Sequence, residues 1–72
     1  MTVAVETGGW IAFAYLGPLD DVQILAGPVS TKDEVLALGA RAFREAADLS
    51  VLGARWYVSQ GSTNTRDAEH IG

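Results

Sequence analysis

Few side chains in this sequence have types and spacings that could support catalysis. His70 is the single histidine, and a lone histidine near the end of a chain is typical of a solvated side chain. Asp20 and Asp21 are adjacent carboxylates that could act as a general acid and base, but neighbouring acids in a turn are usually solvated. The serines and glycines match neither a nucleophile elbow nor a phosphate-binding loop. The sequence therefore predicts a protein that is not an enzyme, with no catalytic residues.

The absence of cysteine narrows the chemistry further. It excludes disulfides, thiolate catalysis and cysteine-based zinc sites, so we expect no metal and no cofactor. A secreted domain of 72 residues would usually carry disulfides, which favours the cytoplasm. The N-terminus lacks the basic region of a signal peptide. The apolar run from Trp10 to Leu16 is far shorter than the ~20 residues that span a bilayer, so no membrane contact is expected.

The charge of the chain indicates what kind of partner it could bind. The formal net charge is −4. Residues 1–40 hold five acids and one lysine, whereas residues 41–72 hold four acids and four arginines. Direct binding to nucleic acid requires a basic surface, so we expect none. A basic partner protein, such as one that itself binds nucleic acid, suits this charge better.

One aromatic residue and five acids form the candidate partner-binding set. Trp10 could bury its ring in a partner as an interface anchor, or it could cover the backbone of the glycine pair beside it. The acids would attract a basic surface. The set is Glu6, Trp10, Asp20, Asp21, Asp33 and Glu34.

These residues must be positioned by a small sheet. Alternating residues 2–6 and aromatic residues 10–16 predict a β-hairpin. A two-residue loop would place Glu6 among large apolar side chains, whereas a three-residue loop over residues 7–9 separates the two faces. We therefore expect one face with Ile11, Phe13 and Tyr15, and the other with Glu6, Trp10, Ala12 and Ala14.

A third strand and a helix follow the hairpin. The turn "GPLDD" precedes a strand "VQILAG", and "TKDE" is a capping box that starts a helix running to about Leu49. The centre of the helix's apolar arc holds Gly39, Ala42 and Ala46, which are small. We expect the helix to lie close against Phe13 and Tyr15.

The predicted fold is a single α+β domain over residues 1–60. Its order is β-β-β-α-β, with a mixed four-stranded sheet, one helix on one face, and the last strand, residues 54–60, parallel to the first. Residues 61–72 are predicted to be a polar, flexible tail or to hold a short strand. Trp56 and Tyr57 should point to opposite faces. The face without a helix, expected to carry Trp10, would be a surface for a partner or for a homodimer.

Two resemblances give this surface a possible function. "VAVETGGWIAFAYLGPLDD" and "AGPVSTKDEVLALGARAFREAADL", within residues 2–49, resemble the N-terminal part of HicB-like antitoxins. That resemblance implies a protein that neutralises a small ribonuclease toxin. In size, acidity and lack of a chemical site, the chain is also similar to phage-encoded anti-CRISPR inhibitors. The leading expectation is a small acidic inhibitor, or DNA mimic, that binds a nucleic-acid-handling protein. The antitoxin is the alternative.

Overall fold

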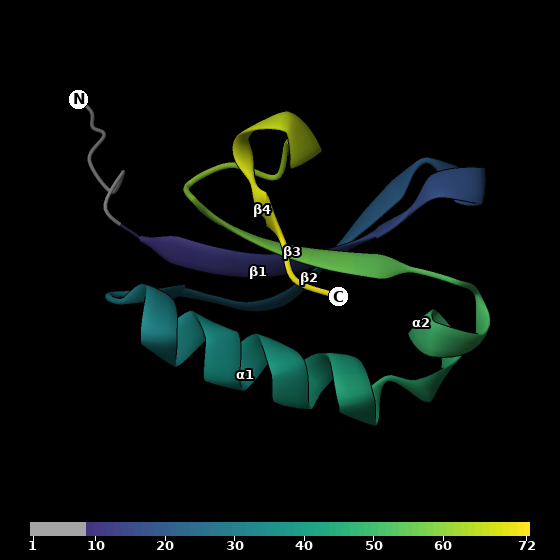
Figure 1. The fold of residues 1–72 in the computed structure, drawn as a ribbon, viewed down its shortest axis with the longest axis horizontal. Coiled ribbons are helices and arrows are strands. Elements are labelled where there is room, and N and C mark those ends of the chain that lie inside the picture. The colour runs from purple at the N-terminus through teal and green to yellow at the C-terminus, as the bar shows by residue number, and fades with distance from the viewer. Residues whose placement is uncertain (1–8) are drawn as a thin grey trace.

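A computed structural model describes residues 9–72 of the chain. The expected strand over residues 2–6, and with it Glu6 and the register of the hairpin, lies outside the described residues. The regular elements in chain order, shown in Figure 1, are β1 (Trp10–Leu16), the 3-10 helix η2 (Gly17–Leu19), β2 (Asp21–Val29), α1 (Lys32–Glu45), α2 (Ala47–Val51), β3 (Arg55–Gln60), the 3-10 helix η3 (Thr65–Asp67) and β4 (Glu69–His70).

The sheet has the strand order β2-β1-β3-β4, and α1 packs on one of its faces. An α+β domain with a four-stranded sheet and one main helix is therefore confirmed. The expectation of a mixed sheet was wrong, because within residues 9–72 every pair of neighbouring strands is antiparallel. The connection through α1 passes from β2 to β3, which run in the same direction. Because β1 lies between them and runs the opposite way, it is antiparallel to both.

The start of α1 agrees with the capping box in the sequence. The Thr31 side chain accepts a hydrogen bond of 3.2 Å from the backbone N–H of Glu34. This bond satisfies one of the N–H groups that a helix leaves free in its first turn. The expected continuous helix to Leu49 is instead two helices, because Ala46 leaves the helical conformation (φ −92°, ψ 74°) between α1 and α2.

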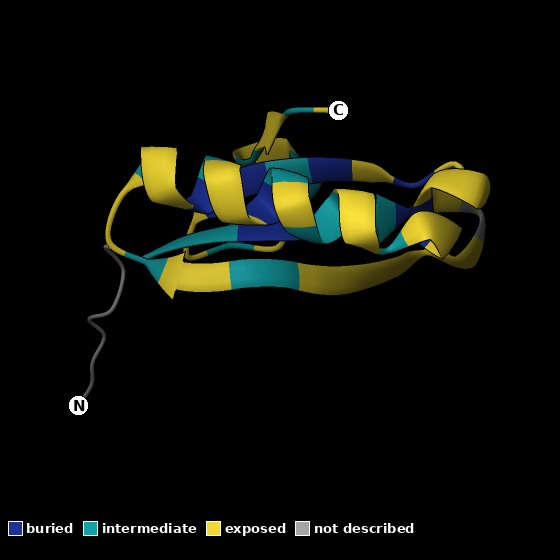
Figure 2. Ribbon diagram, turned by 90° about the horizontal axis from the view of Figure 1, so that it is seen from below, coloured by how far each residue is buried: buried dark blue, intermediate teal, exposed yellow. Residues whose placement is uncertain are grey.

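Gly39 brings α1 close to the sheet, as expected, but against other residues. A Cβ atom on Gly39 would lie 2.6 Å from the Trp56 ring and 2.7 Å from the Ala12 Cβ. The prediction that the helix lies against Phe13 and Tyr15 was wrong. The face under α1 is the one that carries the small residues of β1, and their size leaves room for the Trp56 ring. Figure 2 shows the buried residues between α1 and the central strands; they include Ala12, Ala14, Leu16, Val35, Trp56 and Val58.

The face of the sheet away from α1 is held together by its own aromatic residues. Phe13 is fully buried there, and its ring stacks on Tyr57 with centroids 5.5 Å apart. Because Trp56 belongs to the core under α1, the expectation that Trp56 and Tyr57 point to opposite faces is confirmed.

Residues 61–72 contain η3 and the short strand β4, which pairs with β3. The backbone N–H of Ile71 donates to the carbonyl of Trp56 (2.9 Å), and the N–H of Trp56 donates to the carbonyl of Gly72 (3.0 Å). The turn that carries η3 rises on the side of the sheet opposite to α1 (Figure 1). The C-terminal residues therefore extend the sheet beyond β3.

Candidate functional site

A row of apolar and aromatic side chains crosses all four strands on the side away from α1. Ile24, Phe13, Tyr57 and His70 are partners in register from β2 to β4. Tyr57 stacks on Phe13, and its ring centroid lies 5.1 Å from that of His70. We call this side of the sheet the open face, and by strand alternation it consists of Ile11, Phe13, Tyr15, Val22, Ile24, Arg55, Tyr57, Ser59 and His70.

This row is buried in its middle and exposed at both ends, at Ile24 on β2 and at His70 on β4. Phe13 is buried and Tyr57 half-buried, whereas Ile24 is 50% exposed and Val22, two residues before it on the same strand, is 38% exposed. Leu19, in the turn before β2, is 67% exposed. The buried ring of Phe13 holds the middle of the row in place. The β2 side therefore presents apolar side chains on a rigid support, which is typical of an interaction surface.

Two acids border the open face at the turn between β1 and β2. Asp20 has a left-handed backbone (φ 50°), and its carboxylate accepts a 3.0 Å hydrogen bond from the Tyr15 hydroxyl. The Asp21 carboxylate accepts a 2.9 Å hydrogen bond from the backbone N–H of Val22. Both side chains remain exposed. Beside them is a hollow of about 280 Å³, lined by Tyr15, Gly17, Gly53, Arg55 and Tyr57.

The hydrogen bond to Asp20 raises the pKa of Tyr15 above its ordinary value, and the negative charge of Asp20 raises it further. Both effects favour the neutral phenol. In a Tyr57→Phe background, where Tyr15 is the single tyrosine, we expect Asp20→Asn to lower the pKa of Tyr15, measured by the ultraviolet absorbance of the phenolate. The contact should stabilise the fold below the ordinary phenol pKa and be lost as pH rises through the raised pKa. An identical titration curve for the Asp20→Asn variant and its parent would show that the contact does not form.

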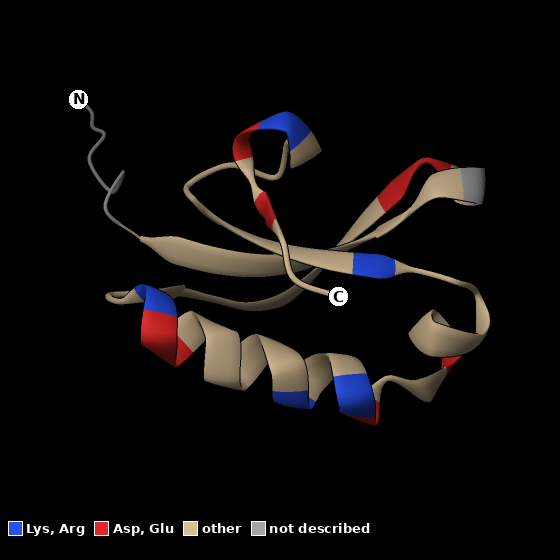
Figure 3. Ribbon diagram, in the orientation of Figure 1, with Lys and Arg blue, Asp and Glu red and all other residues tan. Residues whose placement is uncertain are grey.

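The other acids in the candidate set lie elsewhere. Asp33 and Glu34 are in the first turn of α1, where the helix dipole favours negative charge. Figure 3 shows the acids at the start of β2 and those at the start of α1 at opposite ends of the molecule. The structure therefore places Asp20, through its bond to Tyr15, at the edge of the open face. Asp21 follows at the start of β2 but pairs with Leu16, so its side chain alternates to the α1 side. Asp33 and Glu34 lie on the helical layer.

Trp10 also lies on the helical side of the sheet. It packs against the core under α1, and the ammonium of Lys32 lies 6.0 Å from the centroid of its ring. Lys32 forms an ion pair with Glu69 as well. The expected position of Trp10 on the face without a helix was wrong, because the even-numbered residues of β1 point toward α1.

Sequence reasoning missed the apolar residues that the open face exposes. Val22 and Ile24 alternate within "DVQIL" and were considered only as part of a strand. His70 is exposed, as the sequence predicts for a solvated side chain, and what the sequence did not indicate is that its ring lies beside Tyr57. One signal could have identified this face. Gly39 can approach most closely where the opposing strand carries alanines, which leaves Phe13 and Tyr15 for the opposite side.

Across residues 9–72, no three histidine or acidic side chains come together where they could hold a metal ion. In the same residues, no helix has the length and apolar character needed to cross a membrane.

The fold and the open face together define a two-layer α+β domain whose sheet presents an apolar and aromatic surface away from its helix. Comparison of the chain with protein-family models, with curated proteins and with solved structures found no match. The open face is therefore the feature of the molecule that indicates a function.

Proposed function

We propose that the protein is a non-enzymatic inhibitor that binds a basic, nucleic-acid-handling protein through the open face, in the manner of an anti-CRISPR protein or a DNA mimic. The observation that carries this proposal is the exposure of Ile24 and Val22 beside the buried ring of Phe13, with Asp20 and Asp21 in the adjoining turn. The chain's net charge of −4 favours a basic partner, and the absence of cysteine favours the cytoplasm as the place where the two meet. No chemical step is required of the protein.

The two parts of the face have different roles in binding. Ile24 and Val22 would be buried in the complex, where apolar contacts at the centre of an interface slow dissociation. Asp20 and Asp21 remain in solvent at the border, where charges mainly increase the association rate and its dependence on salt. Arg55 is the cation at the same end of the face, so the two acids leave this end with a net negative charge.

The test is binding kinetics with the partner, which is first recovered from a bacterial lysate and identified by mass spectrometry. Ile24→Ala with Val22→Ala should speed dissociation, at a cost of about 2 kcal/mol if this pair is an interface hot spot. Circular dichroism should show an unchanged fold, because both side chains are partly exposed.

The acids are tested separately. Asp20→Asn with Asp21→Asn should slow association and weaken its salt dependence, and asparagine tolerates the left-handed backbone at position 20. Asp33→Asn with Glu34→Gln removes the same charge on the helical layer and should change association less. If the substitutions at Asp33 and Glu34 slowed association more than those at Asp20 and Asp21, the partner would contact the start of α1 and not the open face.

The identity of the partner separates the two candidate functions. Recovery of a nucleic-acid-binding effector, such as a subunit of a CRISPR complex, supports the inhibitor. Recovery of a small ribonuclease toxin would instead support the HicB-like antitoxin. An affinity that is indifferent to salt and to both substitutions on β2 would contradict binding through the open face in either case.

A further inference from the structure

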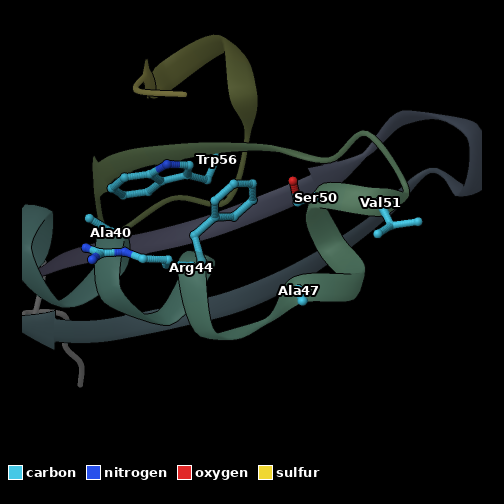
Figure 4. Close-up of a pocket in the computed structure, with 7 residues that line it drawn as sticks. Ala40, Arg44, Ala47, Ser50, Val51 and Trp56 are labelled. Carbon is cyan, nitrogen blue, oxygen red and sulfur yellow. The ribbon is translucent and has the colours of Figure 1, made fainter.

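A second concave surface lies on the helical side of the molecule, away from the open face. It is a hollow of about 580 Å³ where α1 ends and α2 begins (Figure 4). Its volume falls within the range of roughly 300–1,000 Å³ that is common for small-molecule sites. It is lined by Ala40, Phe43, Arg44, Ala47, Ser50, Val51 and Trp56.

The break between the two helices creates this hollow. Ala46 is not helical, so the chain changes direction after Glu45 and α2 does not continue along the axis of α1. The residues that line the walls at this point are small: Ala40 comes from α1, and Ala47 and Ser50 come from α2. Their short side chains leave space above the rings of Phe43 and Trp56.

The lining is largely aromatic and apolar. The Phe43 and Trp56 rings stack with centroids 6.2 Å apart and an angle of 26° between their planes. Trp56 is buried, and Val51 on α2 is 86% exposed. A flat or narrow apolar group entering the hollow would cover the half-buried Phe43 ring and the exposed Val51 side chain and remove them from water.

The hollow also holds a cation that forms no ion pair within residues 9–72. Arg44 reaches along α1 past Ala40 in Figure 4. Arg41, three residues earlier, differs because its Nε donates to the Glu45 carboxylate at 3.2 Å. The side chain of Ser50, on α2, forms no hydrogen bond in the described part of the chain. The hollow thus combines an apolar floor with a guanidinium, unpaired within residues 9–72, at the Ala40 end, while the hydroxyl of Ser50 lies at the other end, near Val51.

We propose that this hollow binds a small amphipathic monocarboxylate, with an aromatic or short aliphatic body. The apolar body lies on Phe43 and Val51, with the buried Trp56 ring beneath. The carboxylate accepts two hydrogen bonds from the guanidinium of Arg44, a geometry that suits a planar fork of donors. This site is separate from the open face, so the inference does not depend on the proposed partner.

The probes are 3-phenylpropionate and its uncharged counterpart of the same shape, 3-phenylpropanamide. Titration of the isotope-labelled full chain, followed by amide chemical shifts, should move the resonances of Phe43, Ala47 and Ser50. The acid should bind about tenfold more tightly than the amide, because a charge-assisted pair of hydrogen bonds is lost in the amide. Equal binding of the two probes would overturn the role of Arg44. Shifts confined to the open face, or none at about 10 mM acid, would overturn the site.

Two pairs of variants make the test specific. Arg44→Gln should weaken binding of the acid about tenfold and remove the preference for the acid, whereas Arg41→Gln makes the same charge change on the same helix and should leave binding unchanged. Ala47→Trp should fill the hollow and abolish binding of both probes. Ala37→Trp, on the exposed side of α1, should not. Equal loss with Arg41→Gln would show a general charge effect and contradict a site at Arg44.

Discussion

Replacing Phe13 by alanine is expected to lower the free energy of unfolding by about 3–5 kcal/mol. Phe13 is fully buried although it lies on the side of the sheet away from α1, and it stacks on Tyr57. Alanine would remove the ring and leave a cavity between β2 and β3. A domain of this size has a total stability of about 5–10 kcal/mol, so the variant would be close to unfolding at room temperature.

Denaturation by urea would measure this loss. Ile24→Ala is the matched control, because Ile24 is Phe13's register partner on β2 and is 50% exposed. It should cost less than about 1.5 kcal/mol, since a side chain that is already half in water loses less on truncation. If both variants lost less than about 1.5 kcal/mol of unfolding free energy, Phe13 would not be the buried centre of the open face. It would then provide no rigid support for Ile24.

Replacing Gly39 by leucine is expected to destabilise the fold by about 1–3 kcal/mol. A Cβ atom alone would lie 2.6 Å from the Trp56 ring and 2.7 Å from the Ala12 Cβ, so a leucine side chain must push α1 away from the sheet. In a domain of this size, 1 kcal/mol corresponds to a change in melting temperature of roughly 4–8 °C. The shift should therefore be visible in a thermal scan.

Two comparisons identify the contact that causes this loss. Ala37→Leu, on the exposed side of the same helix, should leave the melting temperature nearly unchanged. Gly39→Ala should be less damaging when combined with Ala12→Gly, because the second change removes one of the two atoms that would lie within 3 Å of the new Cβ. A Gly39→Leu variant as stable as the parent protein would contradict the packing of α1 against Trp56.

Local features of this protein could be predicted from neighbouring residues. The start of α1 at Lys32 follows from Thr31, whose side chain binds the N–H of a residue three positions later. The strands over residues 10–16 and 55–60 follow from aromatic and β-branched runs between turn signals. The position of Asp20 and Asp21 at the opposite end from Asp33 and Glu34 also follows from the chain, because one strand separates the two pairs.

The arrangement of the strands required the tertiary structure. The strand over residues 55–60 could pair with either edge of the sheet, and the sequence carries no signal that selects one edge. In the structure β3 lies beside β1, so the connection through α1 passes over β1 and the sheet is antiparallel. Residues 69–70 then pair with β3, although the polar segment before them suggested a loose tail.

The choice of face, and therefore of site, was also decided only in three dimensions. Alternation along a strand identifies its buried side when the other side is polar, but both sides of "WIAFAYL" are apolar. What distinguishes them is size. Gly39 can approach Ala12 only if the larger ring of Phe13 points the other way, and the space beside Ala12 is then filled by Trp56 from a strand more than forty residues later in the chain. Shape complementarity between distant residues, which no local pattern encodes, thus placed the aromatic row on the open face and Trp10 beneath the helix.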